Sequence, residues 1–149
     1  MSRRTSVIIA ILSTLSFAPP ILFGFTTALT TGAILLSNLA ANAQSASTYF
    51  DSGIEKSDSG DHQGAIADYD KAIEINPQLS VAYYNRGNSK RILGLYQEAI
   101  SDYSKAIQID PQDFKSYSNR GLAKERIKDY KGAISDLSKA LEINPKDSI

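Results

Sequence analysis

The sequence has no cysteine and a single histidine, His62. Without cysteine the chain forms no disulfide and offers no thiolate to a metal ion or a lipid anchor. One histidine is also too few for an imidazole-rich metal centre. The residue types that carry most metal-binding and nucleophilic chemistry are almost missing, so we expect no cofactor, no metal site and no enzymatic activity.

Net charge is also missing. The 16 basic and 16 acidic residues cancel, and Arg3 and Arg4 are the only charged residues before Asp51. Residues 44–149 therefore keep 14 basic residues (16 less Arg3 and Arg4) and all 16 acidic ones, a net charge of −2. Binding that relies on neutralising phosphates needs a basic surface. Nucleic acid is therefore not an expected partner.

What the sequence does contain is a repeat. The segment DYDKAIEINP at Asp68–Pro77 returns as DYSKAIQIDP at Asp102–Pro111 and as DLSKALEINP at Asp136–Pro145. The offset is 34 residues each time, a period typical of helical solenoids. The three repeats are residues 46–79, 80–113 and 114–147.

Small residues recur inside the repeat at fixed positions and are expected where two helices approach closely. Large residues recur beside them and are expected to fill the neighbouring space. The small positions are Gly53/Gly87/Gly121, Ala65/Ala99/Ala133 and Ala72/Ala106/Ala140, and the large ones are Tyr49/Tyr83/Tyr117 and Tyr69/Tyr103/Leu137. His62 stands where the other repeats have Tyr96 and Tyr130, so we interpret it as a packing residue.

Each repeat is predicted to form two helices. In the second repeat these are Val81–Leu93 and Gln97–Ile109, with the proline at 111 preventing continuation. Gly94 is expected to adopt a left-handed conformation in the turn, like Gly60 in the first repeat. The third repeat has Lys128 at this position.

Ser80 and Asp113 are the expected N-caps of the helices that follow them. Arg86 and Arg120 occur only in the two repeats that have a preceding repeat, and Ser52 replaces them in the first. We expect inter-repeat pairs of Arg86 with Asp68 and of Arg120 with Asp102. This scheme leaves Asp136 without an arginine.

These patterns closely resemble the tetratricopeptide repeat family. The match rests on Tyr83, Gly87, Gly94, Tyr96, Ala99, Tyr103, Ala106 and Pro111, with counterparts in both neighbouring repeats. The resemblance covers Ala46–Asp147 and implies an all-α fold, a right-handed α-solenoid of three helix–turn–helix units. It also implies a concave groove lined by the first helix of each unit.

By this resemblance the groove binds a protein or peptide segment. The site residues that it implies are Phe50, Ile54, Tyr84, Asn85, Asn88, Lys115, Asn119 and Leu122, with Asp51 and Ser118 beside them. The equivalent Asn85 and Asn119 could form a ladder of amides that pairs with a peptide backbone whatever its sequence. The alternative is that asparagine is simply a common residue at this position of the repeat and has no binding role.

Another branch of the family clamps the C-terminal carboxylate of a chaperone tail. Asn85 and Lys115 suit two positions of that clamp. Phe50, Ile54 and Asn119 stand where the branch has Lys, Asn and Arg. The sequence therefore favours an apolar anchor from the partner over a carboxylate.

Residues 1–43 belong to a different class of sequence. Arg3 and Arg4 precede an apolar stretch that starts at Val7, and this stretch ends in the small-x-small pattern Ala41-Asn42-Ala43. This order is typical of a secretory signal peptide that is cleaved after Ala43. We therefore expect an exported protein, in a bacterial periplasm or secreted.

Two alternatives to a cleaved signal remain. The apolar stretch is long and interrupted by Pro19-Pro20, and Ile21–Ala43 could just span a bilayer as an uncleaved anchor, with the repeats outside the inner membrane. The start Ser2-Arg3-Arg4 also partly matches a twin-arginine export signal. A thylakoid lumen is a less favoured location.

The sequence thus predicts an exported adaptor or assembly module, without chemistry of its own, that binds a partner segment in its groove. The alternative is a structural module that self-associates. The second helix of the third repeat has Ile134 and Leu141 on its outer side, and we expect this uncapped end to stack on a second copy or on a partner.

Overall fold

The computed structural model describes residues 37 and 45–146. The chain divides into two units, residues 1–39 and 40–149, and all the helices described below belong to the second. Apart from Ser37, the predicted signal or anchor segment lies outside the described residues. Residues 45–146 form six helices: residues 45–58, α2 (His62–Ile75), α3 (Ser80–Ile92), α4 (Tyr96–Ile109), α5 (Phe114–Arg126) and α6 (Tyr130–Ile143). No strand occurs in residues 45–146.

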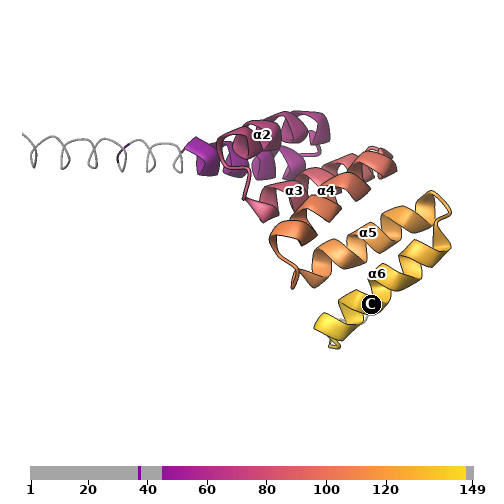
Figure 1. The fold of residues 1–149 in the computed structure, drawn as a ribbon. Coiled ribbons are helices and arrows are strands. Elements are labelled where there is room, and N and C mark those ends of the chain that lie inside the picture. The colour runs from indigo at the N-terminus through magenta and orange to yellow at the C-terminus, as the bar shows by residue number, and fades with distance from the viewer. Residues whose placement is uncertain (1–36, 38–44, 147–149) are drawn as a thin grey trace, which may run out of the picture. The chain divides into compact units, whose positions relative to one another are not determined.

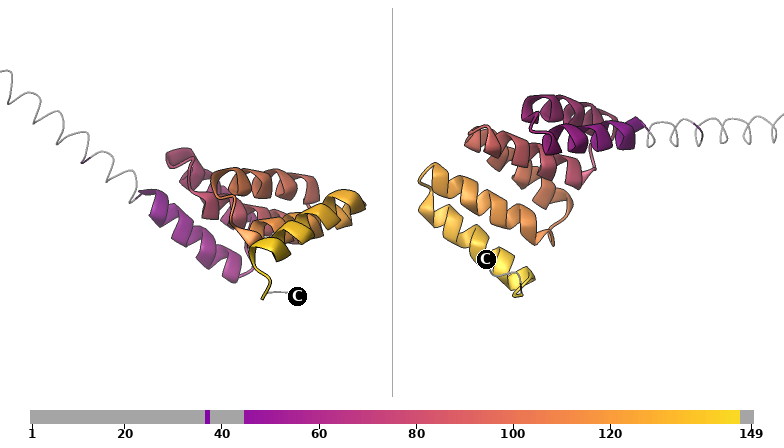
Figure 2. Two further views of the ribbon diagram at one scale, coloured as in Figure 1. Left: turned by 60° about the horizontal axis from the view of Figure 1, so that its bottom comes forward. Right: turned by 180° about the vertical axis from the view of Figure 1, so that it is seen from behind.

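The helices form successive antiparallel pairs along the chain (Figures 1 and 2). Helix α3 pairs with α4 and α5 with α6, while contacts of α2 with α3 and of α4 with α5 join one pair to the next. Helix α3 also touches α5, so the first helices of repeats two and three form a row. The predicted all-α solenoid of helix–turn–helix units is confirmed. Because every described helix contact lies within residues 40–149, this unit carries its own core.

Each pair is held at a close crossing between a glycine and a large side chain. A Cβ on Gly87 would lie 2.8 Å from Cε1 of Tyr103, which is fully buried. The same position at Gly53 faces Tyr69, and at Gly121 it lies 2.9 Å from Cγ of Leu137. Such short contacts leave no room for a larger residue. The predicted role of these glycines at helix crossings is confirmed.

The turns inside the repeats use a left-handed residue, as expected. Gly60 has φ 88° and Gly94 has φ 78°. Lys128 adopts the same conformation with φ 67°, although a side chain in this region costs about 1–2 kcal/mol. The turn of the third repeat is therefore strained where the other two are relaxed.

Aspartates cap three of the helices. Asp113 caps α5, as predicted, by accepting a hydrogen bond from the Lys115 amide at 3.1 Å. Asp61 and Asp129 cap α2 and α6 in the same way. The prediction of Ser80 as a cap is wrong, because α3 already begins at Ser80 and its N-cap, Leu79, makes no side-chain hydrogen bond.

A buried aspartate in each second helix binds cations from the first helix of its own repeat. Asp102 accepts hydrogen bonds from Arg86 Nε at 2.9 Å and from Lys90 Nζ at 2.8 Å. Asp136 does the same with Arg120 Nε at 2.8 Å and Lys124 Nζ at 2.8 Å. These carboxylates are almost fully buried, so each ion pair fixes the geometry of its helix pair.

The predicted pairs of Arg86 with Asp68 and Arg120 with Asp102 are therefore wrong. The arginine and its aspartate are 16 residues apart within one repeat, a separation that brings the two helices of a hairpin face to face. Asp136 is paired, and within the part of the chain that the structure describes it is Asp68 that has no arginine partner. Asp68 binds Ser52 at 2.7 Å and Lys56 at 2.5 Å instead.

The arginines nevertheless reach the preceding repeat through their remaining nitrogen. Arg86 Nη1 lies 2.5 Å from the Asp70 carboxylate, and Arg120 Nη1 lies 3.0 Å from Ser104 Oγ. Asp70 and Ser104 occupy equivalent positions in α2 and α4. The prediction that the arginines link neighbouring repeats is thus confirmed, but the acceptors are Asp70 and Ser104 rather than Asp68 and Asp102.

Burial and pairing act in opposite directions on Asp136. Burial by itself would raise the pKa of its carboxyl, but hydrogen bonds from Arg120 and Lys124 outweigh it and lower the pKa. The pKa of Asp68 is lowered mainly by its hydrogen bond to Lys56 and then by that to Ser52.

A lowered folded-state pKa stabilises the fold at pH values above the unfolded pKa of about 3.9, and this stabilisation is lost as the pH falls through the folded value.

We expect Asp136→Asn to destabilise the protein by about 2 kcal/mol or more at pH 7, because Arg120 and Lys124 lose their charged partner. The variant should also lose less stability than the natural protein between about pH 4 and pH 2. Thermal unfolding at pH 7 and across this acidic range measures both effects. Glu74→Gln, at an exposed position of α2, is the control for the charge change. An unchanged pH profile in Asp136→Asn would contradict the prediction.

Candidate functional site

The larger hollow of the groove lies between residues 45–58, α3, α5 and the loop that precedes α5. Its volume is about 520 Å³. The lining residues are Phe50, Ser80, Val81, Tyr84, Asn85, Asp110, Gln112, Asp113, Phe114 and Lys115. Four of the predicted groove residues are among them: Phe50, Tyr84, Asn85 and Lys115. The stack of repeats thus brings together side chains that are up to 65 residues apart in the sequence, from Phe50 to Lys115.

Aromatic side chains form the apolar part of this hollow. Phe50 packs on the buried Tyr69 with ring centroids 5.9 Å apart, and Tyr84 packs on the buried Tyr103 at 6.1 Å. Val81, 47% exposed, also belongs to the lining. Since two of the rings rest on buried tyrosines, the apolar wall is already in place without a ligand.

The rim of the hollow is polar and carries more negative than positive charge. Asp110 and Asp113 lie on it, with Lys115 as the one cation of the lining. Asp113 is committed to the cap of α5 and to a bond from Ser116 Oγ at 2.5 Å. Among the described residues, the Asn85 side chain makes no hydrogen bond. Its amide is therefore available to a ligand as donor and acceptor.

The other asparagines are used inside the protein. Asn119 Nδ2 donates to Asn88 Oδ1 at 2.9 Å and to Tyr84 Oη at 3.2 Å. Tyr103 Oη donates to the same Asn88 oxygen at 2.8 Å. Burial raises the pKa of Tyr103, so its hydroxyl keeps the proton that it donates. This cluster ties α3, α4 and α5 together beneath the groove, and both N–H groups of Asn119 are occupied.

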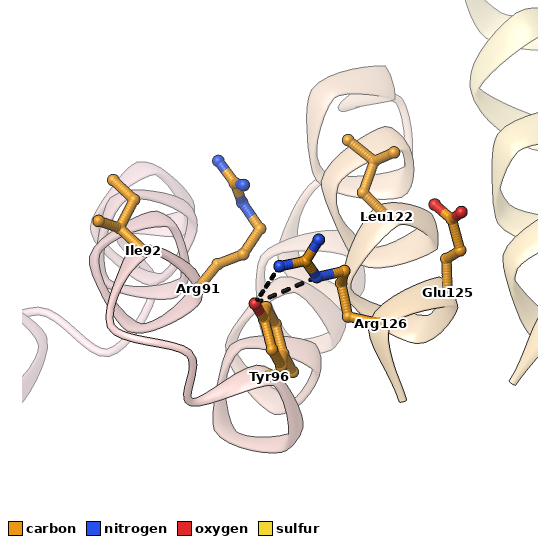
Figure 3. A pocket seen from close by; sticks show the side chains of 6 residues that line it. All are labelled: Arg91, Ile92, Tyr96, Leu122, Glu125 and Arg126. Carbon is orange, nitrogen blue, oxygen red and sulfur yellow. Dashed lines mark hydrogen bonds between the residues drawn. The ribbon is translucent and has the colours of Figure 1, made fainter. Parts of the chain in front are cut away.

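A smaller hollow of about 360 Å³ lies at the other ends of α3 and α5 (Figure 3). Here Arg126 donates to Tyr96 Oη from Nη2 at 2.9 Å and from Nε at 3.1 Å, and its guanidinium lies 5.3 Å from the centre of the Tyr96 ring. The predicted groove residue Leu122 lines this hollow rather than the larger one. Ile54 is half-buried and lines neither.

Several lining residues of the larger hollow are not among those predicted. Val81 and Phe114 belong to the first turn of a helix, and Asp110, Gln112 and Asp113 belong to the loop before α5. The prediction considered mostly positions well inside the first helices. The signal that could have found the others is the end of the repeat, where the chain after Pro111 must return to the start of the next first helix.

His62 begins α2 half-buried, with Nδ1 3.5 Å from Ser57 Oγ. In the described part of the chain no group of three His, Cys, Asp or Glu residues is placed to hold a metal ion. No helix within those same residues is long and apolar enough to cross a bilayer.

A stack of helix pairs with an open, partly apolar groove defines the chain as a protein-interaction module. Models of the tetratricopeptide repeat match residues 80–113 and 114–147, and a related repeat model matches residues 57–91. Together these matches span more than half of the sequence. The chain belongs to the tetratricopeptide repeat family.

Solved structures of this family resemble the chain over most of the described residues. The Arabidopsis OM64 TPR domain is 29% identical with a TM-score of 0.70, over 72% of this chain and 88% of that one. The first TPR of Spaghetti (RPAP3), bound to HSP90 peptide SRMEEVD, is 26% identical with a TM-score of 0.70, over 71% and 84%. MamA is 32% identical with a TM-score of 0.67, over 70% of this chain and 61% of that one. A search of curated proteins gave no match.

The two equivalent asparagines are expected to respond differently to substitution. Asn119→Ala should destabilise the fold by about 1–2 kcal/mol, because it breaks two hydrogen bonds and leaves Asn88 with one donor fewer. Asn85→Ala should change stability by less than about 0.5 kcal/mol. Urea unfolding of residues 44–149 measures both values. Equal losses in the two variants would show that Asn85 also has a structural partner.

Proposed function

We propose that this protein is an exported adaptor that binds an extended segment of a partner protein in the larger hollow of its groove. The observation that carries the proposal is a preformed aromatic wall beside an amide, Asn85, that has no partner within the described residues. Apolar surface supplies affinity, and a few polar groups orient the ligand. No step of bond making or breaking is part of this function.

Peptide binding in related structures supports this proposal. The first TPR of Spaghetti is bound to HSP90 peptide SRMEEVD, and the TPR2B domain of yeast Sti1 forms a complex with pHsp70. The HSP90 peptide and pHsp70 are partners of those two proteins. In this chain Phe50 and Ile54 stand at two clamp positions, and Asn119 has both N–H groups occupied. Asp110 and Asp113 on the rim also disfavour an acidic ligand.

The chemistry of the hollow therefore favours a segment with an apolar or aromatic side chain rather than an acidic C-terminal tail. That side chain would rest against Phe50, Val81 and Tyr84. Asn85 would pair with the backbone of the segment, since an amide both donates and accepts. A basic residue beside the anchor would meet Asp110, and this adds selectivity more than affinity.

Selection of peptides from a random display library against residues 44–149 tests the groove. We expect the selected peptides to share an apolar residue, and Val81→Asp and Asn85→Ala each to weaken binding at least about tenfold, or 1.4 kcal/mol. Both substitutions alter the lining without removing a described hydrogen bond. Titration of one synthetic selected peptide against each variant gives the values.

Leu95→Asp is the matched control, because it places the same charge at an exposed apolar residue outside both hollows. Peptides that end in acidic residues, or that bind all variants equally, would argue against the proposed site. If the selected peptides do bind in the groove, cross-linked pull-down from the exported fraction with the same variants would identify the natural partner.

Export is the second part of the proposal and is supported only by the pattern of residues 1–43. A positive start, an apolar stretch and Ala41-Asn42-Ala43 together favour cleavage before Gln44 and release outside the cytoplasm. The repeats would then meet their partner in a periplasm or in the medium. Without cleavage they would meet it at the outer side of the inner membrane.

Expression of the full chain in a bacterial host tests cleavage. Mass spectrometry of the exported fraction should find a protein that begins at Gln44, and Ala43→Leu should leave the chain uncleaved in the membrane fraction, because the cleavage site requires small residues. Full-length natural protein in the membrane fraction would instead establish an anchor, and protein confined to the cytoplasm would exclude export.

A further inference from the structure

The second helix of each repeat carries the same three-residue pattern on one of its sides. It consists of an apolar residue, a polar residue four positions later and a second apolar residue seven positions after the first, which a helix places on one side. The three copies are Ile66/Asp70/Ile73 on α2, Ile100/Ser104/Ile107 on α4 and Ile134/Ser138/Leu141 on α6. We call the third copy the α6 face.

The apolar residues of the first two copies are buried or half-buried, whereas those of the third copy are exposed. Ile66 is 9% exposed, and Ile100 packs against a buried cluster that includes Ala123 of α5. Ile134 is 67% exposed and Leu141 is 44% exposed. Among helices α2 to α6, only α5 contacts α6. The α6 face therefore has the same pattern as the two faces on which a helix packs, but no helix in the described part of the chain packs on it.

The helices that cover the first two copies share a pattern. Helix α3 has Ala82, Arg86 and Ser89, and α5 has the equivalent Ser116, Arg120 and Ala123. All four small residues are fully buried, which lets the helices approach closely. The arginine in the middle donates to the polar residue of the face beneath it, Asp70 or Ser104.

The acceptor for a third arginine is present on the α6 face. Ser138 is exposed and lines an open hollow of about 470 Å³. The other lining residues are Tyr117 and Arg120 of α5 and Ser135, Asp136, Lys139 and Glu142 of α6. Its equivalent in α4, Ser104, is the residue that receives Arg120 Nη1 at 3.0 Å. The apolar residues and the acceptor are therefore in place, and the hollow lies beside the acceptor.

We propose that the α6 face is a docking site for a helix from a partner protein, one that carries a small residue, an arginine four residues later and a second small residue seven residues after the first. This site is separate from the groove. Its occupant is defined by the two helices that already cover the same face within this chain, α3 and α5.

A second copy stacked head to tail does not meet this requirement. The helix of residues 45–58, which such a copy would bring to the α6 face, has Thr48, Ser52 and Glu55 at the three positions. Glu55 is charged where α3 and α5 have fully buried Ser89 and Ala123. Burying this carboxylate against Ile134 and Leu141 without a partner is unfavourable. Ser52 is also too short to replace the arginine.

A synthetic peptide with the sequence of residues 80–93 serves as the probe, because it carries the Ala82, Arg86 and Ser89 pattern. A side-chain staple that replaces the residues at positions 84 and 88, on the opposite side, holds it helical. Fluorescence anisotropy against residues 44–149 should show saturable binding. Ile134→Asp should weaken binding at least tenfold, while Leu95→Asp should leave it unchanged. A peptide with alanine in place of the arginine should bind at least fivefold more weakly.

Absence of binding, or equal binding to Ile134→Asp, would overturn the proposal. Sedimentation of the protein alone provides the second measurement. A dimer that becomes a monomer in Ile134→Asp would assign the α6 face to a second copy and would also overturn the proposal. With no helix docked on α6, peptides selected on the groove should bind Ile134→Asp normally, so the two proposals can succeed or fail independently.

Discussion

The packing of Tyr103 against Gly87 supports most of what surrounds the groove. Because the glycine leaves room for the ring, α3 and α4 lie close enough for Arg86 and Lys90 to reach Asp102. The same ring supports Tyr84 in the lining of the larger hollow, and its hydroxyl holds Asn88, which in turn holds Asn119 of the next repeat. One close contact thus sets the spacing of a helix pair, the wall of the hollow and a link between repeats.

The 34-residue period was enough to predict the number of helices, their pairing and the residues at the crossings. These features depend on small and large residues that recur at fixed spacing, so a linear pattern records them. The partner of each arginine was not predictable in this way. Asp68 and Asp102 are equally good carboxylates, and only the packing of two helices shows which one a guanidinium reaches.

The site was predicted in part for a similar reason. Phe50, Tyr84, Asn85 and Lys115 lie on first helices, where the family pattern indicates a groove, and they do line one hollow. Asn119 looked equivalent to Asn85 in the sequence, yet its amide is bound to Asn88 and Tyr84. Whether a polar side chain is free or occupied depends on contacts between repeats, and the period alone does not contain them.

The left-handed Lys128 makes the third repeat the least stable part of the stack. In a repeat array each unit is stabilised by its own hairpin and by its neighbours, so a unit with a strained turn and one neighbour among the described repeats opens first. That unit is the third repeat, which also carries the open α6 face. Fraying should therefore begin at this end and spread toward α3, and any helix that settles on α6 would suppress it. Occupancy of one end and order in the groove would then be thermodynamically linked, although the two surfaces share no residue.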